Sequence, residues 1–536
     1  MRKWHGNPWA VLITLSLGFF MTLLDLTIVN IAMPSMIDQL HASLDEILWV
    51  VNAYVLILAV LLITAGRLGD VRGQRTMFIF GVATFTVASL LCGISQNPAE
   101  LIAARCVQGL GAAMLLPQTM AIIIATFPPQ RRGAALGIWG AVAGVAAIAG
   151  PTLGGFLVSA FDWRWIFFVN LPVGVVVLIA AFTIIPSVKQ ERSHRLDLGG
   201  VLIATAALFC LSFALTEGQR YDWNAWIWGL GAASILLLVV FLIQQRTQQA
   251  NEPLVPFSLF RDRNYTILNF IAAAVSVGMI GMFLPLTIYL QSVLGYSALK
   301  SGLVMAPMSV ISMFVAPFAG RLSDRIGGKF ILMGGLTLYG LGMAWIVLIA
   351  EPTTNWPAFW PALIVSGLGV GCVFAPMATE AMRGIEPRMA GAASGVYNTI
   401  RQIGSVVGSA AMGAVLQNQL ASSLRHEATV RAGQLPPQAR GPFVAGFKNA
   451  GTGGIEVGAG QSGAAQNVPQ NLPKEIADQV SQVAKAVFDH GFVAAMKPTM
   501  ALPIVVVLVG ALSCLVMKRH VKAGEPQPTE TVEASA

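Results

Sequence analysis

The 536-residue sequence is 55% hydrophobic and 11% charged, whereas soluble domains carry about 25% charged residues. Its net charge of +8 does not indicate a nucleic-acid-binding protein, because the basic residues lie mainly in short segments between apolar runs. The five cysteines all fall within apolar runs without paired spacing, which argues against a disulfide framework and a metal site. The composition favours a polytopic, all-α membrane protein.

Fourteen apolar runs approach the length of about 20 residues that a membrane-spanning helix needs. They are residues 10–32, 47–65, 76–95, 101–124, 136–159, 165–185, 199–216, 227–244, 267–290, 302–320, 330–350, 360–382, 394–418 and 500–517. The first run follows Arg2 and Lys3, but it is too long for the apolar part of a signal peptide and contains Asp25. We therefore expect it to be a retained span.

The distribution of basic residues predicts the orientation. With the N-terminus in the cytoplasm, 21 of the 33 Lys and Arg residues fall in cytoplasmic segments and three in short outer loops. This excess predicts that both termini are cytoplasmic. A long outer segment, residues 419–499, holds seven more, and its apolar residues from Ile476 to Phe492 recur at helical spacing. That spacing predicts an amphipathic helix, which is either a solvated loop helix or a lid.

A short charged turn occurs twice. The segment Gly66–Arg75 joins the second and third runs, and Gly320–Lys329, 254 residues later, joins the tenth and eleventh. The candidate gating residues in these turns are Gly66, Arg67, Asp70, Arg72, Gly73, Arg75, Gly320, Asp324, Arg325 and Gly327. We expect the glycines to permit tight reversals and Asp70 to accept hydrogen bonds at a helix start. A simple charged turn that only sets orientation is the alternative.

The repeat also predicts the domain organisation, because repeated turns within repeated apolar runs indicate a duplicated membrane unit. A plain duplication of six spans would place the second turn between spans eight and nine, so two spans must be inserted between the halves. We expect an N-terminal six-helix bundle, two inserted spans, a C-terminal six-helix bundle that includes the long outer segment, and a disordered cytoplasmic tail. Their bounds are residues 1–186, 187–265, 266–522 and 523–536.

Charged residues within the spans are the candidates for chemistry, because the sequence contains neither a phosphate-binding loop nor a His-Glu-x-x-His motif. Asp25 and Arg105 both lie in the outer halves of their spans, where they can meet. An ionisable residue in a span faces a cavity or a partner, so we predict that Asp25 is the protonatable group for coupling and that Arg105 is its electrostatic partner or a substrate ligand. The alternative is an ion pair that only sets helix register.

Other polar and small residues in the spans are weaker candidates. Asn30, Gln108, Glu380 and Arg401 are possible residues of a substrate or proton pathway. Glu380 and Arg401 could instead anchor helix ends at the interface. The fifth run carries Gly140, Gly144, Gly150, Pro151, Gly154 and Gly155. Small residues one turn apart permit close helix packing, and a smooth, bendable face that opens a path is the alternative.

Taken together, these motifs resemble the major facilitator superfamily and, more narrowly, the fourteen-span drug:proton antiporters of the QacA and EmrB type. The segments that carry the resemblance are Leu24–Pro34, Gly66–Arg75 with Gln74 at a commonly basic position, Arg105–Gly111, Gly150–Gly155 and Trp163–Pro172. The resemblance implies two six-helix bundles that rock about a central cavity. It also implies that Asp25 and Arg105 couple protons to export.

These features predict an exporter of drugs or other lipophilic compounds in a cell membrane. We expect a monomer among membrane lipids, driven by the proton gradient without another cofactor, and an accessory periplasmic partner is possible. A dedicated exporter of one endogenous metabolite or lipid is the alternative. A membrane-embedded enzyme would need clustered His, Asp or Ser at one interface, and the sequence contains no such cluster.

Overall fold

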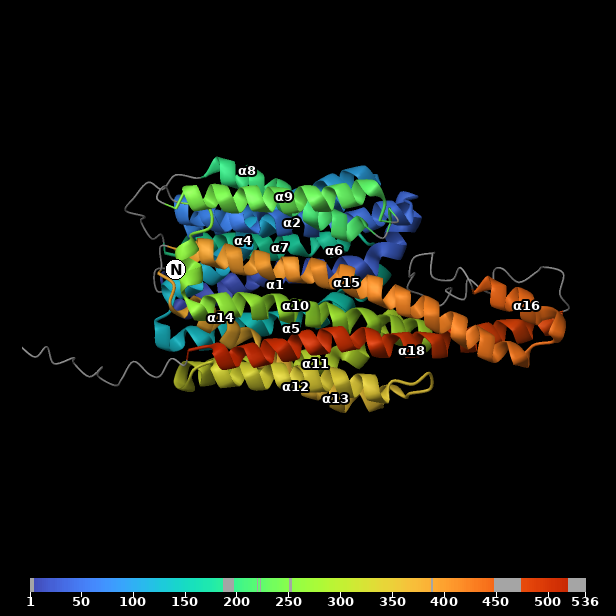
Figure 1. Ribbon diagram of the computed structural model, residues 1–536. Helices are drawn as coiled ribbons and strands as arrows, with labels where there is room; N and C mark the ends of the chain where they lie inside the picture. Colours follow the sequence, from blue (N-terminus) through green and yellow to red (C-terminus); the bar gives the residue numbers. More distant parts are fainter. Residues whose placement is uncertain are drawn as a thin grey trace, which may run out of the picture.

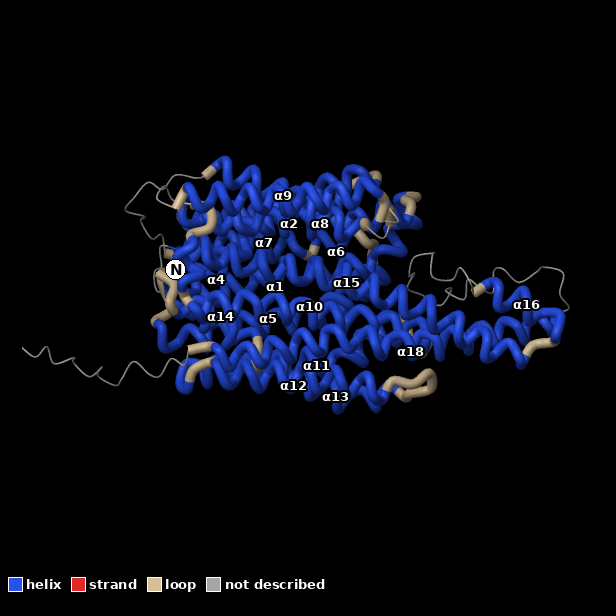
Figure 2. Tube along the Cα trace, viewed as in Figure 1, coloured by secondary structure: helices blue, strands red, loops and turns tan. Residues whose placement is uncertain are grey.

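The computed structural model describes residues 4–186, 197–218, 220–221, 223–249, 253–386, 389–447 and 474–518. Helices run side by side along one direction and form an elongated bundle (Figure 1). Loops join them at the two ends, and no strand occurs in the described ranges (Figure 2). We call the end that carries the two repeated turns the turn end.

The N-terminal half consists of α1 (Pro8–Leu40), α2 (Leu44–Arg72), α3 (Gln74–Ile94), α4 (Pro98–Thr126), α5 (Arg132–Ala160), α6 (Trp165–Phe168) and α7 (Asn170–Ile184). A 3-10 turn, Pro129–Arg131, precedes α5. Side chains that accept from backbone amides begin several of these helices. Asn7 caps α1, Ser43 forms a capping box with Glu46 at α2, and Asn97 caps α4. Local capping therefore defines where the long apolar helices start.

The rest of the chain consists of α8 (Leu198–Glu217), α9 (Ala225–Thr247), α10 (Arg263–Ile288), α11 (Ala298–Ile326), α12 (Lys329–Ile349), α13 (Phe359–Gly371), α14 (Phe374–Arg383), α15 (Ala390–Arg431), α16 (Pro437–Gly446) and α18 (Lys474–Ser513). Short 3-10 turns are Phe257–Arg261, Trp356–Ala358, Ala432–Gln434 and Cys514–Val516, and a π turn, Tyr289–Val293, follows α10. Every predicted span falls on these helices, although several run one to four residues past a helix end, and α6 and α7 share one predicted span and α13 and α14 another.

The predicted count of fourteen spans is not supported. Twelve helices among the described residues are long and apolar enough to cross a membrane. The two predicted spans that fall short are those of α5 and α15. In α5 the described side chains form an unbroken apolar stretch over Arg132–Ala146, and the side chains at positions 147, 148 and 151 lie outside the described residues. The first half of α15 includes Asn398, Arg401 and Gln402, which lower its hydropathy.

The helices α8 and α9 pack on one another at the flank of the bundle (Figure 1). Of the two, α8 also lies against α2 and against α15. Leu208 of α8 packs with Leu56 and Val60 of α2, and the Asn52 amide of α2 donates to Glu217 at 3.1 Å. This pair of helices therefore contacts both halves of the chain.

A helical hairpin projects from the end opposite the turn end (Figure 1). It is formed by residues 416–447 and 474–496, in which α15 and α18 pack together. Leu420 and Leu424 of α15 and Val483 and Val487 of α18 are buried in one apolar core. The helix predicted between Ile476 and Phe492 is therefore present, but it is continuous with the last span and its apolar face is covered by α15. Residues 448–473 of the predicted outer segment lie outside the described ranges.

Candidate functional site

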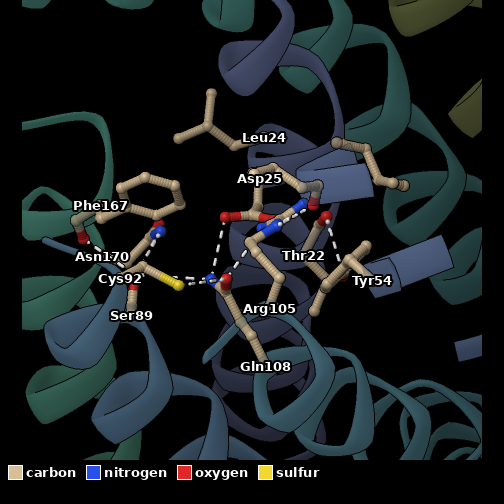
Figure 3. A network of polar contacts seen from close by, with 12 residues as sticks. Thr22, Leu24, Asp25, Tyr54, Ser89, Cys92, Arg105, Gln108, Phe167 and Asn170 are labelled. Carbon is tan, nitrogen blue, oxygen red and sulfur yellow. Dashed lines mark hydrogen bonds and ion pairs between the residues drawn. The ribbon is translucent and has the colours of Figure 1, made fainter. Parts of the chain in front are cut away.

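The predicted pair of charged residues lies in the interior of the N-terminal half. Arg105 of α4 forms an ion pair with Asp25 of α1, and both side chains are 0% exposed. Gln108 joins the pair, since its amide nitrogen donates to Asp25 at 2.9 Å and its oxygen accepts from Arg105 at 2.8 Å (Figure 3). The predicted pathway residue Gln108 is thus a direct neighbour of both charges.

The helix geometry explains why these groups meet. Arg105 and Gln108 are three positions apart on α4, so they lie on one face of the helix. The Arg105 Nε donates to the carbonyl of Val50 on α2 at 2.9 Å. The guanidinium also lies 4.4 Å from the centroid of the Tyr54 ring, at the distance of a cation–π contact. Nε and Nη1 of the guanidinium are therefore held by groups from α1, α2 and α4, whereas Nη2 has no hydrogen-bond partner among the described residues.

The polar network extends into α3 and α7 (Figure 3). The Gln108 amide donates to the Ser89 hydroxyl at 3.4 Å, and the Asn170 amide donates to the same hydroxyl at 3.1 Å. The Cys92 thiol donates to the Gln108 oxygen at 3.5 Å. The sequence analysis missed Tyr54, Ser89, Cys92 and Asn170. Each is a polar, small or aromatic residue within an apolar run, and such residues are too common in spans to identify a site from the sequence.

A single proton would change the charge balance of this arrangement. While Asp25 is ionised, the two charges neutralise each other in a region without water-exposed atoms. Protonation of Asp25 would leave the Arg105 guanidinium as an uncompensated buried cation, and an unpaired buried charge is costly. Protonation would therefore weaken the contact that this ion pair makes between α1 and α4.

A second feature is found at the turn end, where the two repeated turns contact the opposite halves. The Asp70 carboxylate accepts from the backbone amides of Gly391 and Ala392 at 2.9 and 2.7 Å. These amides belong to the first turn of α15. An acidic side chain at a helix N-terminus satisfies free amides and complements the helix dipole.

The second copy makes the reciprocal contact. The Asp324 carboxylate of α11 accepts from the amides of Gly133 and Ala134 at 2.8 and 2.9 Å. These amides belong to the first turn of α5. Each turn aspartate therefore caps a helix of the other half, and together the two caps supply four hydrogen bonds between the halves.

The glycines of the turns have two separate roles, which corrects the prediction that all of them permit reversals. Gly73 and Gly327 adopt φ angles of 96° and 86° and do form the reversals. Gly66 and Gly320 instead lie within α2 and α11. A Cβ on Gly66 would lie 2.4 Å from the Gly391 carbonyl oxygen, and a Cβ on Gly320 would lie 2.1 Å from that of Gly133. These two glycines permit the halves to touch.

The basic residues of the turns are placed differently from one another. Arg67 is buried, whereas Arg72 and Arg325 are exposed. Arg75 donates to the carbonyl of Phe182 on α7 at 2.6 Å. The exposed Arg72 and Arg325 are the ones that fit the alternative in which a charged turn only sets the orientation of the protein in the membrane.

The remaining pathway candidates do not join the buried network. Glu380 lies at the second turn, where it accepts from the Gly328 amide at 2.7 Å and pairs with Arg383 at 3.2 Å. Asn30 is exposed and donates to the carbonyl of Leu26 on its own helix. Arg401 lies on α15 and is partly exposed.

The glycines predicted for the fifth span pack closely at three positions. A Cβ would lie 2.9 Å from the Ser309 carbonyl oxygen at Gly144, 2.1 Å from the Thr27 hydroxyl at Gly150 and 2.7 Å from Ile28 at Gly154. The surface of α5 thus contacts α11 of the other half and α1 of its own half. At Gly140 the nearest atom is 3.7 Å away, and at Gly155 none lies within 4 Å. The side chain of Pro151 lies outside the described residues.

The comparison with protein families identifies the chain. The profile of the Major Facilitator Superfamily matches residues 15–409. The chain belongs to this superfamily. The expectation of a transporter and not a catalyst agrees with this membership.

Relatives within the superfamily support the same assignment. The chain is 40% identical to an uncharacterized MFS-type transporter of Mycobacterium tuberculosis, over 83% of this chain and 78% of the relative. It is 35% identical to the multidrug resistance protein Stp of the same species, over 77% and 76%. It is also 35% identical to a probable actinorhodin transporter of Streptomyces coelicolor, over 78% and 74%.

A solved structure shows the same fold. The human organic anion transporter MFSD10 superposes with a TM-score of 0.59 over 94% of this chain and 99% of its own, at 12% sequence identity. At that identity the likeness concerns the fold alone. The protein is thus a multi-pass membrane protein of the major facilitator superfamily.

Proposed function

We propose that this protein exports drugs or other lipophilic and amphipathic compounds across the cytoplasmic membrane in exchange for protons. The observation that carries the proposal is the buried Asp25–Arg105 pair with Gln108. A carboxyl group whose protonation changes helix packing is what proton coupling requires. Relatives named as multidrug resistance and antibiotic transport proteins favour export of such compounds.

We also propose that α5 and α15 cross the membrane, which gives fourteen spans arranged as six, two and six. Packing supports this, because α5 lies between α1 and α11, and α15 lies between α2 and α10. The excess of basic residues at the turn end supports a cytoplasmic location of that end and of both termini. The protein would then act as a monomer that uses the proton gradient and no other cofactor.

Alternating access follows from the two features of the site. The cytoplasmic end is closed while Asp70 and Asp324 cap the helices of the opposite halves. Opening of that end requires these hydrogen bonds to break. We propose that protonation of Asp25 weakens its pairing with Arg105, and that the resulting change in α1 and α4 is transmitted to the turn end through the bundle.

Transport by inverted membrane vesicles tests this function. Vesicles containing the protein should accumulate several unrelated lipophilic dyes and drugs when the interior is made acidic, and a protonophore should abolish the accumulation. Accumulation that survives the protonophore, or that never exceeds the level of vesicles without the protein, would exclude proton-driven export.

A dedicated exporter of one endogenous compound is the second candidate. The similarity to a probable actinorhodin transporter favours it, since that name refers to a single compound. The same vesicles decide between the candidates. Accumulation of one compound from a structurally diverse panel would favour the dedicated exporter, and accumulation of several unrelated compounds would favour the multidrug exporter.

A further inference from the structure

The charged residues predicted in the spans differ in how they are neutralised. Asp25 and Arg105 neutralise each other. Glu380 pairs with Arg383 and accepts from a backbone amide. In the part of the chain that the structure describes, the Arg401 side chain has neither a hydrogen-bond partner nor a carboxylate partner. Arg401 is thus a cation without a counter-charge among the described residues, in a helix that we propose to cross the membrane.

The contacts of α15 show which way the side of the helix that carries Arg401 faces. Gly404 and Gly408 approach Ala273 and Val277 of α10, in the same half. At the other side of the helix, the nearest atoms to a Cβ on Gly395 belong to Leu62, Gly66 and Ile63 of α2, in the opposite half. Viewed along the axis of α15, residue 401 lies in the sector between the side of the helix that contacts α10 and the side that contacts α2. Arg401 therefore faces the boundary between the two halves.

The opposite side of α15 confirms this direction. Ile403, two positions from Arg401 and so on the far side of the helix, packs with Leu56, Val60 and Leu208. That side is covered by α2 and α8. The lipid-facing direction lies on the far side as well, since Val407 is 41% exposed. A snorkelling role for Arg401 at the lipid interface does not fit this placement.

The depth of Arg401 makes the missing counter-charge significant. It lies eleven residues after Ala390, the first residue of α15, which is about 16 Å along a helix. The hydrocarbon core is about 30 Å thick, and counted from the predicted start of the span at residue 394, residue 401 lies about 10 Å into it. A charge at that depth is costly and usually serves function, and transporter substrates bind near the midplane between the halves.

Polar residues accompany Arg401 along the same face. Ser394, Asn398, Arg401 and Ser405 follow one another at spacings of four, three and four residues, which aligns them on one side of a helix. Ser394 and Asn398 are buried, whereas Arg401 and Ser405 are partly exposed. The face is therefore closed toward the turn end and becomes accessible at Arg401.

We infer that Arg401 binds the head group of the transported compound, and that this compound is an amphiphile with a negatively charged carboxylate or phosphate. A guanidinium binds such groups with two parallel hydrogen bonds. The hydroxyl of Ser405 is one turn away and can donate as well. The inference rests on the proposed export function, for which it names the substrate class.

A pair of probes with the same alkyl chain and opposite charges tests this inference. The full-length protein is reconstituted in nanodiscs, and binding of decanoate and of decyltrimethylammonium is measured by calorimetry against empty nanodiscs. Alkyl phosphate of the same length is the third probe, which distinguishes the two anionic head groups. The variants are Arg401→Gln and Arg401→Lys, and the matched control is Arg425→Gln, an exposed arginine farther along α15.

We expect the wild-type protein to bind an anionic probe more tightly than the cationic one. Arg401→Gln should weaken anionic binding at least about tenfold, as expected for loss of a charge-assisted hydrogen bond. Arg401→Lys keeps the charge but loses the two parallel hydrogen bonds, so it should bind more weakly than the wild type and more tightly than Arg401→Gln, and Arg425→Gln should change nothing. Equal wild-type affinities for the anionic and cationic probes, or unchanged anionic binding in Arg401→Gln, would overturn the inference.

The experiments distinguish failure of proton-coupled export from failure of the anionic substrate class. If binding of decanoate depends on Arg401 but no compound is driven by a proton gradient, the head-group contact stands and proton-coupled export fails. If vesicles export cationic dyes and Arg401→Gln binds decanoate like the wild type, export stands and the anionic substrate class fails.

Discussion

At the scale of single residues, the buried network contains groups that carry charge and a group that positions them. Asp25 and Arg105 carry the charges, and Gln108 contacts both while also reaching Ser89 of α3. A glutamine in this position neutralises nothing, but it supplies a donor to the carboxylate and an acceptor to the guanidinium. Its role is to fix the geometry in which the pair is stable.

Replacement of Gln108 by methionine should therefore destabilise the protein. The change keeps the volume but leaves an Asp25 oxygen and an Arg105 nitrogen each without one partner, at a cost of about 1–3 kcal/mol per unsatisfied group. We expect a clear fall in the melting temperature of the detergent-solubilised protein. The exposed Gln434→Met is the control and should melt like the wild type. An unchanged melting temperature in Gln108→Met would show that the amide does not support the pair.

The sequence predicts part of this network. Asp25 and Arg105 are recognisable because a charge in an apolar run needs a partner, and their estimated depths agree. The supporting groups are harder to predict, because they reach the site only through tertiary packing. They are Tyr54 of α2, Ser89 of α3 and Asn170 of α7. Nothing in their local sequence distinguishes them from other polar or aromatic residues in spans.

At the scale of elements, the repeated turn is a reciprocal contact between halves. The sequence analysis predicts that Asp70 meets a helix start, but periodicity alone does not reveal that the helix is α15 of the other half. The long hairpin was missed for a related reason. Its apolar residues Leu416, Leu420 and Leu424 recur every four positions, yet they lie on both sides of the predicted end of a span at residue 418 and lead into a segment rich in Gly and Gln.

The turn aspartates should control access from the turn end. Asp70→Asn replaces two charge-assisted hydrogen bonds with one acceptor of lower charge, so the cap on α15 weakens. We expect impaired transport with normal membrane insertion, and a larger defect when Asp324→Asn is added.

A cysteine at Ser394, in a background without the native cysteines, reports the structural effect. Ser394 is fully buried on the first part of α15, so its thiol should react faster with an impermeant reagent at the turn end when Asp70 is replaced. Wild-type transport and thiol reactivity in both single mutants would reduce the turns to orientation signals.

Substitution of a glycine where helices of the two halves touch gives a sharper test of the closed turn end. Gly66→Ala places a methyl group 2.4 Å from the Gly391 carbonyl oxygen, so α2 and α15 must separate. We expect this variant to lose most transport, measured as dye export at equal protein levels. Gly155→Ala is the matched control, because no atom lies within 4 Å of the added group. Equal activity of the two variants would contradict the proposed closure.

At the scale of the whole molecule, the duplication predicts two halves, and the structure shows where they touch. The direct contacts run through α2 with α15 and through α5 with α11. Length and composition support twelve spans, and the two helices that fall short, α5 and α15, are the ones that make these contacts. In α15, polar residues such as Asn398, Arg401 and Gln402 lower the hydropathy by which a span is recognised.

The fourteen-span topology can be tested directly. Cysteines at Ser193 and Ser462, both in segments outside the described residues, should react with an impermeant thiol reagent from opposite sides of the membrane. Ser193 should react only from the cytoplasmic side. Reaction of both from the same side would exclude the six, two and six arrangement.

Drug-induced proton release in proteoliposomes tests most directly whether Asp25 couples protons to export. The matched variant is Asp25→Asn, which keeps the shape of the side chain and removes its titration. We predict that the wild-type protein releases protons when drug is added and that the Asn variant releases none, while Asp25→Glu retains partial coupling. If the Asn variant exchanges protons for drug at the wild-type rate, Asp25 is structural and the proposed mechanism is wrong.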